Sequence, residues 1–402
     1  MRESSCRVCR SHALARGALR PRACCGGCCV RRIAVVTGTR AEWGLLRSVC
    51  SAIDAHAELE LVIVAGGAHF LPPVPTIHEV RSFGAPMQEF SMQREGETGR
   101  LADAAAFGRG VTNLASIVAL LTPDVVVVLG DRIEALAAAS AASIGGICVA
   151  HIHGGDRAEG VADEAMRHAI TKLAHIHFPA SPKSAERIER MGEDPSRIHC
   201  TGSPAVDGLA AIPAMSDARY AALASPQYVV LFHPCGRSDR DEHADATTLL
   251  AATSSRGRVL ALRPNADAGN GGIVQAIAEA IERTKDITTI DHLARDEFIG
   301  LLKRPEVRAL VGNSSAGLLE AAALGTRTLN LGNRQRGRER AENVVDCVEC
   351  SASALHIALT QVEALAPVPS AQFGDGQTGV RIAELLASAD PNRYSLAKHN
   401  TF

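Results

Sequence analysis

Carboxylate, imidazole and guanidinium groups follow several predicted apolar strands, where they could move protons and hold phosphate. Asp131 and Arg132 come directly after one such run and a glycine, and His153 and Asp156 lie in the glycine turn after the next. Asp163 follows shortly afterwards. Burial raises a carboxyl pKa and an adjacent guanidinium lowers it. Asp131 is therefore interpreted either as an acid–base group or as the ion-pair partner of Arg132.

A metal site is an alternative for the histidines of this region. His151 and His153 alternate onto one face of an extended segment, and more histidines follow. No pair among them has the HExxH spacing of a zinc site, however, and Asp156 and Asp163 can act as acid and base without metal. Asp163 also begins an acidic first helical turn, which the helix dipole alone would explain. We therefore expect no metal.

The stretch 311–339 reads VGNSSAGLLEAAALGTRTLNLGNRQRGRE and predicts a nucleotide diphosphate site. Ser314 and Ser315 precede a predicted helix whose first N–H groups would bind an anion. Glu320 lies five residues beyond Ser315, about 7.5 Å along a helix, which suits the hydroxyls of a ribose. Arg334, with two more arginines in the same loop, offers forks that match phosphate. The alternative is an ordinary βαβ corner with a solvated basic loop.

Three further strand ends carry polar residues of interest. Arg40 follows the first strand and could contact phosphate or pair locally with Glu42. His233 precedes a proline and is expected at the edge of the site rather than in the core, and Asn265 follows another strand. The turn TGTRAEWG lacks the G-x-G-x-x-G pattern of dinucleotide-binding proteins, so no redox cofactor is expected.

Continuous apolar strands that alternate with helices predict an α/β protein with two doubly wound, Rossmann-like domains. The chain has 402 residues, enough for two cores, because domains tend to split beyond about 250–300 residues. We expect an N-terminal domain at 30–205, a C-terminal domain at 206–375, and a terminal helix and tail at 376–402. The expected strands lie at 33–37, 59–65, 124–129, 147–152, 228–232, 259–262, 287–290, 307–311 and 326–331.

Residues 1–29 differ in composition from the rest of the chain. They hold six of the twelve cysteines, and two C-x-x-C pairs there fit a four-thiolate zinc site. The lack of apolar periodicity favours a disordered or non-native extension instead. The formal charge of −2 gives no basic excess for nucleic acid, and no uninterrupted apolar run approaches the roughly 18 residues that span a bilayer. We expect a cytoplasmic protein with reduced cysteines.

Seven segments, taken in order, resemble the hydrolysing UDP-N-acetylglucosamine 2-epimerases of the sialic-acid and legionaminic-acid pathways. They are TGTRAEWG, LGDR, HIHGGD, DEAMRHAITKLAH, FHP, PNADAG and the stretch 311–339. The resemblance covers about residues 31–390 and implies a glycosyltransferase-B-like fold, with the nucleotide sugar in a cleft between two domains. It also implies no cofactor and a homo-oligomer, either a dimer or a tetramer.

The resemblance assigns roles residue by residue. It implies that Asp131 and Asp163, and more loosely His153, Asp156 and His233, do the acid–base work. His153 stands where non-hydrolysing relatives carry a glutamate, which favours the hydrolysing branch. Substrate contacts would be made by Arg40, Gly44, Arg132, His233, Asn265, His292, Ser314, Ser315, Glu320 and Arg334.

The implied reaction converts UDP-N-acetylglucosamine, or a UDP-diacetamido relative, to UDP and the 2-epimeric free sugar through a glycal. The alternatives are a non-hydrolysing 2-epimerase and a nucleotide-sugar-binding protein without activity. The segment 66–77 lacks the acidic-aromatic-glycine loop usual in the family, and Cys235-Gly236 replaces the residues common after His-Pro. Both departures concern the part of the site that would hold the sugar.

Overall fold

The computed structural model describes residues 30–72, 75–97, 99–157, 164–265, 269–388, 398 and 401, which fall into two compact units. The described parts of 30–152, 173–176 and 379–388 belong to the first unit, and those of 153–172 and 177–378 to the second. Residues 1–29 and Asp163 lie outside the described residues.

The first sheet has six strands in the order β3-β2-β1-β4-β5-β6, and its pairings from β3 to β5 are parallel. All five residues of β4, with the sequence VVVVL, are buried, as expected for a strand covered on both faces. The strands are β1 (Arg31–Thr37), β2 (Leu59–Gly66), β3 (Met87–Phe90), β4 (Val125–Leu129), β5 (Cys148–Ile152) and β6 (Ile176–Phe178).

Helices connect these strands, and the first of them begins with a capping box. The Thr39 hydroxyl accepts a hydrogen bond from Glu42 N, and the Glu42 carboxylate accepts one from Thr39 N, so each residue satisfies a donor that the helix end leaves open. The connecting elements are α1 (Arg40–Ala55), η2 (Gly67–Phe70), α2 (Ile77–Arg81), α3 (Arg100–Leu121), α4 (Ile133–Ile144), α5 (Glu164–Leu173), α6 (Pro182–Arg190) and η3 (Pro195–Arg197).

Within the described residues, α3 is long and apolar enough to cross a membrane by length and composition. Arg100, Asp103 and Arg109 interrupt its apolar residues, which is why the sequence shows no continuous apolar run there. A single helix of this kind is weak evidence, since core helices of soluble proteins pass the same test. α3 packs against α4, and Arg109 Nε donates to Met92 O at 2.8 Å.

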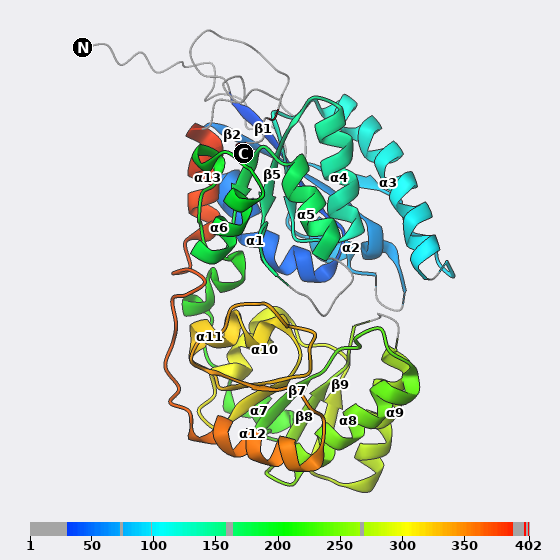
Figure 1. Cartoon of the computed structure of the whole chain (residues 1–402), viewed down its shortest axis with the longest axis vertical. Coiled ribbons are helices and arrows are strands. Elements are labelled where there is room, and N and C mark those ends of the chain that lie inside the picture. Colours follow the sequence, from blue (N-terminus) through cyan, green and yellow to red (C-terminus); the bar gives the residue numbers. More distant parts are fainter. Residues whose placement is uncertain are drawn as a thin grey trace, which may run out of the picture. The chain divides into compact units, whose positions relative to one another are not determined.

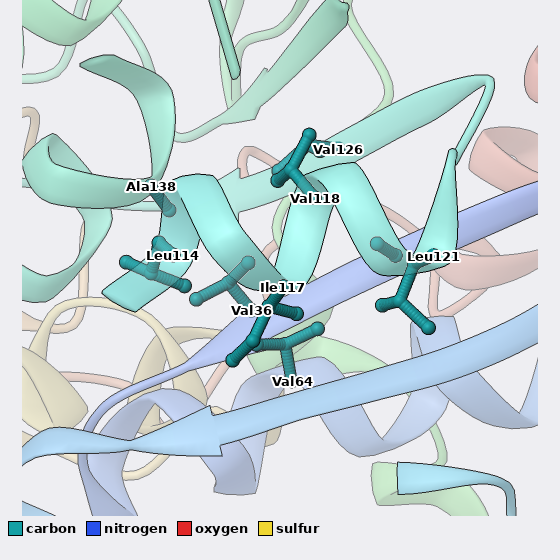
Figure 2. Close-up of a pocket in the computed structure, with 9 residues that line it drawn as sticks. Val36, Val64, Leu114, Ile117, Val118, Leu121, Val126 and Ala138 are labelled. Carbon is teal, nitrogen blue, oxygen red and sulfur yellow. The ribbon is translucent and has the colours of Figure 1, made fainter. Parts of the chain in front are cut away.

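A small pocket lies between α3 and the first sheet (Figure 2). Its lining is wholly apolar: Val36, Val64 and Val126 from three strands face Leu114 and Ile117 of α3, with other aliphatic residues around them. The pocket presents no side chain that could hydrogen-bond a polar ligand. We interpret it as imperfect packing of α3 on the sheet rather than as a binding site.

The second sheet repeats this plan in the order β12-β11-β10-β7-β8-β9, with every pairing parallel. The strands are β7 (Tyr228–Leu231), β8 (Val259–Leu262), β9 (Ile287–Ile290), β10 (Ala309–Gly312), β11 (Thr328–Leu331) and β12 (Val344–Cys347). The helical elements are η4 (Pro204–Val206), η5 (Leu209–Ala211), α7 (Asp217–Ala222), α8 (Asp239–Ser254), α9 (Asn270–Arg283), α10 (Arg295–Leu302), η6 (Ser315–Gly317), α11 (Glu320–Leu324) and α12 (Ala352–Ala364).

The predicted fold class is confirmed, because each unit has a parallel sheet with helical connections. The nine strands expected from the sequence are present, and β3, β6 and β12 are additional, short strands near the sheet edges. The last helix, α13 (Thr378–Ser388), is coloured red in Figure 1 and belongs to the first unit. Arg31 donates hydrogen bonds to Leu386 O and Ala387 O at the end of this helix.

Candidate functional site

Each sheet reverses its strand order at one point, and the predicted site residues gather there. In the second sheet β7 pairs with β10 on one side and with β8 on the other, so the reversal lies between β7 and β10. In the first sheet it lies between β1 and β4. Ligands of doubly wound sheets bind at the carboxyl ends of the strands beside such a point.

Asn313 joins the elements that meet at this point of the second sheet. It is fully buried; its Oδ1 accepts from His233 N and its Nδ2 donates to His233 O, both at 2.7 Å. Its backbone oxygen accepts from Arg334 Nη1 at 3.2 Å and from Gln335 Nε2 at 2.9 Å. One asparagine therefore fixes the end of β7 and the arginine loop after β11 against the end of β10.

His233 is held in one orientation by its ring as well as by its backbone. Its Nδ1 accepts from Asn265 N at 3.1 Å, so in the neutral ring the proton is on Nε2. The expected placement of His233 at the edge of a site agrees with its partial burial. Asn265 lies beside it, whereas His292 is exposed in the segment after β9.

The helix predicted after Ser314 is present as the helical segment Ser315–Leu324, which begins with the 3₁₀ turn η6 and ends with α11. Ser314 Oγ accepts from Ala316 N at 3.3 Å, and a Cβ added at Gly317 would lie 2.6 Å from Thr328 Cγ2. The turn therefore packs closely on β11.

His153 is the centre of a second buried cluster in the same unit. Its ring contacts Asp156 Oδ2 through Nδ1 at 3.0 Å and Ser203 Oγ through Nε2 at 2.9 Å. Its φ of 65° is unusual for a residue with a Cβ, and such strain persists where the surroundings enforce it, often at functional sites. Both nitrogens of His153 thus have protein partners.

Asp156 is less buried than His153, and its charge is stabilised. Its Oδ1 accepts from Ser184 Oγ at 2.7 Å, and its backbone oxygen accepts from Arg167 Nη1 at 2.9 Å. Burial would raise the pKa of Asp156, but His153, the Arg338 cation and the Ser184 hydroxyl together hold it below the usual value. These neighbours therefore favour the ionised form of Asp156, whose carboxylate contacts the His153 ring.

Glu320 and Arg338 extend this cluster. Burial raises the pKa of Glu320, and Arg295, His153 and Arg338 oppose the shift. Burial lowers the pKa of Arg338, while Asp156 and Glu320 raise it. Burial and the neighbouring Arg338 lower the pKa of Arg167 to about 9. The second unit thus places two partly buried cations, Arg295 and Arg338, near the carboxylate expected to bind ribose.

In the first unit, Asp131 and Arg132 follow β4 at the reversal point, and both are partly buried. Arg132 Nε lies 3.5 Å from Glu134 Oε2, so Arg132 has an ion-pair partner other than its neighbour in the sequence. Arg40 is exposed at the start of α1, and Gly44 lies one turn later. Glu42 accepts from Gly38 N at 2.7 Å and from Thr39 N at 3.1 Å, which leaves Arg40 at the surface.

The structure therefore brings most predicted residues together within each unit, as two sets. The first unit holds Asp131, Arg132, Arg40 and Gly44; the second holds His153, Asp156, His233, Asn265, Ser314, Ser315, Glu320 and Arg334, with His292 apart from them at the surface. Among the described residues, no group of three or more His, Cys, Asp or Glu side chains could hold a metal ion.

Sequence reasoning missed Asn313, Ser203 and Arg167 as members of the site. Asn313 had a usable signal, since it directly follows an apolar strand. Ser203 lies 50 positions from the histidine that it contacts, and no local spacing predicts that contact. Arg167 is buried within an amphipathic helix whose pattern gives it no special place.

Comparisons with known proteins agree with this geometry. The family model described as UDP-N-acetylglucosamine 2-epimerase matches residues 51–387. The UDP-N,N'-diacetylbacillosamine 2-epimerase (hydrolyzing) of Legionella pneumophila is 33% identical over 381 residues, which cover 93% of this chain and 100% of that protein. The UDP-N-acetylglucosamine 2-epimerase of Neisseria meningitidis serogroup B is 31% identical over 323 residues, 79% of this chain and 83% of that protein.

Among solved structures, the UDP-GlcNAc 2-epimerase from Neisseria meningitidis bound to UDP-GlcNAc superposes with a TM-score of 0.74 at 17% identity. The match covers 89% of this chain and 100% of that one, and at this identity it supports the fold alone. The family model and the first relative span nearly the whole sequence. The chain therefore belongs to the UDP-N-acetylglucosamine 2-epimerase family.

Proposed function

We propose that this protein is a hydrolysing 2-epimerase, which converts UDP-N-acetylglucosamine or a UDP-diacetamido relative to UDP and the 2-epimeric free sugar. With UDP-N-acetylglucosamine the free sugar would be N-acetylmannosamine. The C2 proton has no neighbouring carbonyl, so its removal must accompany the departure of UDP from C1. The C1–O bond breaks, C2 loses its proton and a C1=C2 glycal forms. Water then adds its oxygen to C1, and C2 is protonated from the opposite face.

The observation that carries this proposal is the link through Asn313 between His233 and the Arg334 loop at the reversal point of the second sheet. It supports a nucleotide diphosphate site in which Arg334 faces phosphate and Glu320 accepts the ribose hydroxyls. Fixed cations beside the departing diphosphate would stabilise the charge that develops there. The relative with the hydrolysing activity in its name, at 33% identity, supports the choice of hydrolysis.

The remaining roles follow from the positions of the side chains. Asp131 is the proposed acceptor of the C2 proton, because it is a partly buried carboxylate directly after β4, at the reversal point of the first sheet. Arg132 would bind the diphosphate. Asp156 and Ser203 engage both ring nitrogens of His153, so we propose that His153 orients the site and does not itself transfer the C2 proton. Asp163 remains a proposed acid–base residue outside the described residues.

The test is a reaction in deuterium oxide with UDP-N-acetylglucosamine and with its 4-acetamido-6-deoxy relative, side by side. We expect free UDP and a 2-epimeric sugar in equal amounts, with deuterium at C2. Deuterated UDP-sugar without free UDP would show a non-hydrolysing epimerase. UDP with an unlabelled, unepimerised sugar would show simple hydrolysis. No turnover of either substrate would contradict the proposal.

A further inference from the structure

Two buried glutamates, Glu42 and Glu134, lie at the reversal point of the first sheet. Glu42 belongs to the first turn of α1 and is 7% exposed, and Glu134 belongs to the first turn of α4 and is fully buried. The reaction proposed above uses neither. Carboxylates are seldom buried unless they are paired, so both require an explanation.

Three turns enclose Glu134. A Cβ added at Gly38, after β1, would lie 2.3 Å from Glu134 Cγ, and one added at Gly67, after β2, would lie 2.6 Å from the same atom. From the segment after β3, Gln93 Nε2 donates to Glu134 Oε1 at 2.5 Å. Since Gly38 N also donates to Glu42 Oε2, both glutamates contact the same glycine.

One oxygen of each carboxylate lacks a hydrogen-bond donor within the part of the chain that the structure describes. Glu42 Oε1 and Glu134 Oε2 are buried and accept no hydrogen bond from any described residue. Glu134 Oε2 faces Arg132 Nε at 3.5 Å, but the Arg132 side chain is 39% exposed. Two buried anions thus face one guanidinium that water partly screens. A proton on Glu42 Oε1 would remove the excess negative charge and give that oxygen a hydrogen to donate.

The charges around Glu42 also favour its protonated form. Burial and then the charge of Glu134 raise the pKa of Glu42 to about 7, while Arg132 and the N–H groups of Gly38 and Thr39 oppose the shift. Asp131, after β4, and His69, after β2, are further titratable groups at this sheet edge. His69 bonds Thr37 Oγ1 at 3.0 Å, and burial lowers its pKa to about 4. His69 is therefore neutral in the range where Glu42 titrates.

We propose that Glu42 and Glu134 are positioning residues, that Glu42 carries a proton, and that the pair in this form fixes the orientation of Arg132. When the proton leaves, the two carboxylates repel each other across the Gly38 turn. Glu134 then shifts with its partner Arg132, and the diphosphate contact weakens. The proposal rests on the role of Arg132 in the function proposed above.

The discriminating variant is Glu42→Gln. Its amide oxygen can accept from Gly38 N and Thr39 N, and its amide nitrogen can donate where the proton would be. The variant thus imitates the protonated residue and cannot ionise. For the unaltered protein we expect KM for the UDP-sugar to rise severalfold between about pH 6 and about pH 9, with a smaller effect on kcat. For Glu42→Gln we expect KM to stay level over that range.

Two further variants complete the test. Glu134→Gln removes the partner of Arg132, so KM should be raised at every pH. Glu58→Gln removes an exposed negative charge from the same unit and should behave as the unaltered protein does. If Glu42→Gln keeps the unaltered pH dependence of KM, or if Glu134→Gln leaves KM unchanged, the proposal is overturned.

A measurement without turnover separates this proposal from the proposed function. Because the pKa of Glu42 is raised in the folded state, the stability that it contributes is present below its unfolded pKa and is lost as the pH rises through about 7. The difference in Tm between Glu42→Gln and the unaltered protein should therefore grow from about pH 5 to about pH 8. A constant difference would refute the proton on Glu42 even if the protein proved to be an active epimerase. A growing difference in a protein without turnover would support the proton on Glu42 and contradict only the proposed function.

Discussion

The hydroxyl of Ser203 lies 2.9 Å from Nε2 of His153, on the side of the ring opposite Asp156. Serine, histidine and aspartate in this order resemble the nucleophilic triad of hydrolases. Ser203 is fully buried, however, and its oxygen also accepts from Ala205 N at 3.2 Å as the cap of η4. A serine in this position supports the histidine and is not a nucleophile.

Ser203→Ala should therefore lower stability and should not abolish turnover. It removes a cap and leaves a buried ring nitrogen without its partner, so we expect a loss of about 1–3 kcal/mol in the free energy of unfolding. Chemical denaturation measures this. Ser216→Ala is the matched control, because Ser216 caps α7 through Arg219 N at an exposed site. Equal losses in the two variants would mean that the contact with His153 contributes nothing.

Arg334→Ala should weaken UDP binding by about 1.5–3 kcal/mol, the range for lost charged hydrogen bonds. Isothermal titration with UDP checks this without requiring turnover. Arg336→Ala is the control, because Arg336 is exposed in the same loop and its loss changes the charge equally. Similar weakening in both variants would indicate a diffuse electrostatic effect and would remove Arg334 from the binding site.

Asp131→Asn preserves size and removes the proposed proton acceptor, so the rate should fall by roughly 10²–10⁴-fold. UDP affinity should remain near that of the unaltered protein, because the proposed nucleotide contacts are mainly residues of the second unit. Rapid-quench assays and UDP titration measure the two quantities. Asp103→Asn, an exposed carboxylate of α3, is the control. An unchanged rate in Asp131→Asn would exclude this residue from proton transfer.

The acid side of the stability profile should depend on His69. Burial lowers its pKa to about 4, and Thr37 and Thr76 hold its two ring nitrogens. A histidine with a depressed pKa contributes stability that is present above its unfolded pKa of about 6.5 and is lost as the pH falls through about 4. The loss amounts to at most about 3 kcal/mol. In the His69→Gln variant, the free energy of unfolding should change less between about pH 6.5 and about pH 4 than in the unaltered protein, and chemical denaturation at several pH values measures this.

Activity should survive a chelator. Arg334, Arg338 and Arg132 supply positive charge that a divalent ion would otherwise provide, and guanidinium forks match phosphate oxygens. Assays after EDTA treatment, with and without added Mg²⁺, measure the effect. A strict requirement for a divalent ion would contradict this prediction and would assign the diphosphate to a metal.

The sequence was sufficient to predict the sheets and the places where polar residues gather. Buried parallel strands need continuous apolar residues on both faces, and β4 shows this as four valines and a leucine. The residues that follow parallel strands of one sheet must lie at the same edge of that sheet, which is why Asp131 could be selected in the first sheet and His233 and Ser314 in the second. Edge strands such as β12 are short and partly polar, so they lacked this signal.

The contacts within the site could not be predicted in the same way. Glu134 looks like an ordinary acidic residue in a first helical turn, and its burial depends on Gly38, Gly67 and Gln93, which belong to distant segments. The helix predicted after Ser314 begins with a 3₁₀ turn in which Gly317 packs closely on Thr328, a tertiary contact that a helical pattern does not record. Helix propensity is a property of one segment of the sequence. The burial of Glu134 and the packing of Gly317 depend instead on segments that only the tertiary fold brings next to them.

The place of α13 in the first unit has a consequence for biosynthesis. Its hydrogen bonds to Arg31 join the start of the first strand to residues that the ribosome adds more than 350 positions later. At elongation rates of about 5–20 residues per second this delay is on the order of tens of seconds. During this time the surface of the nascent first unit that packs against α13 remains exposed, while the second unit emerges from the ribosome and folds. Premature termination anywhere in the second unit would release a first unit that lacks its final helix, a natural substrate for chaperones and proteases.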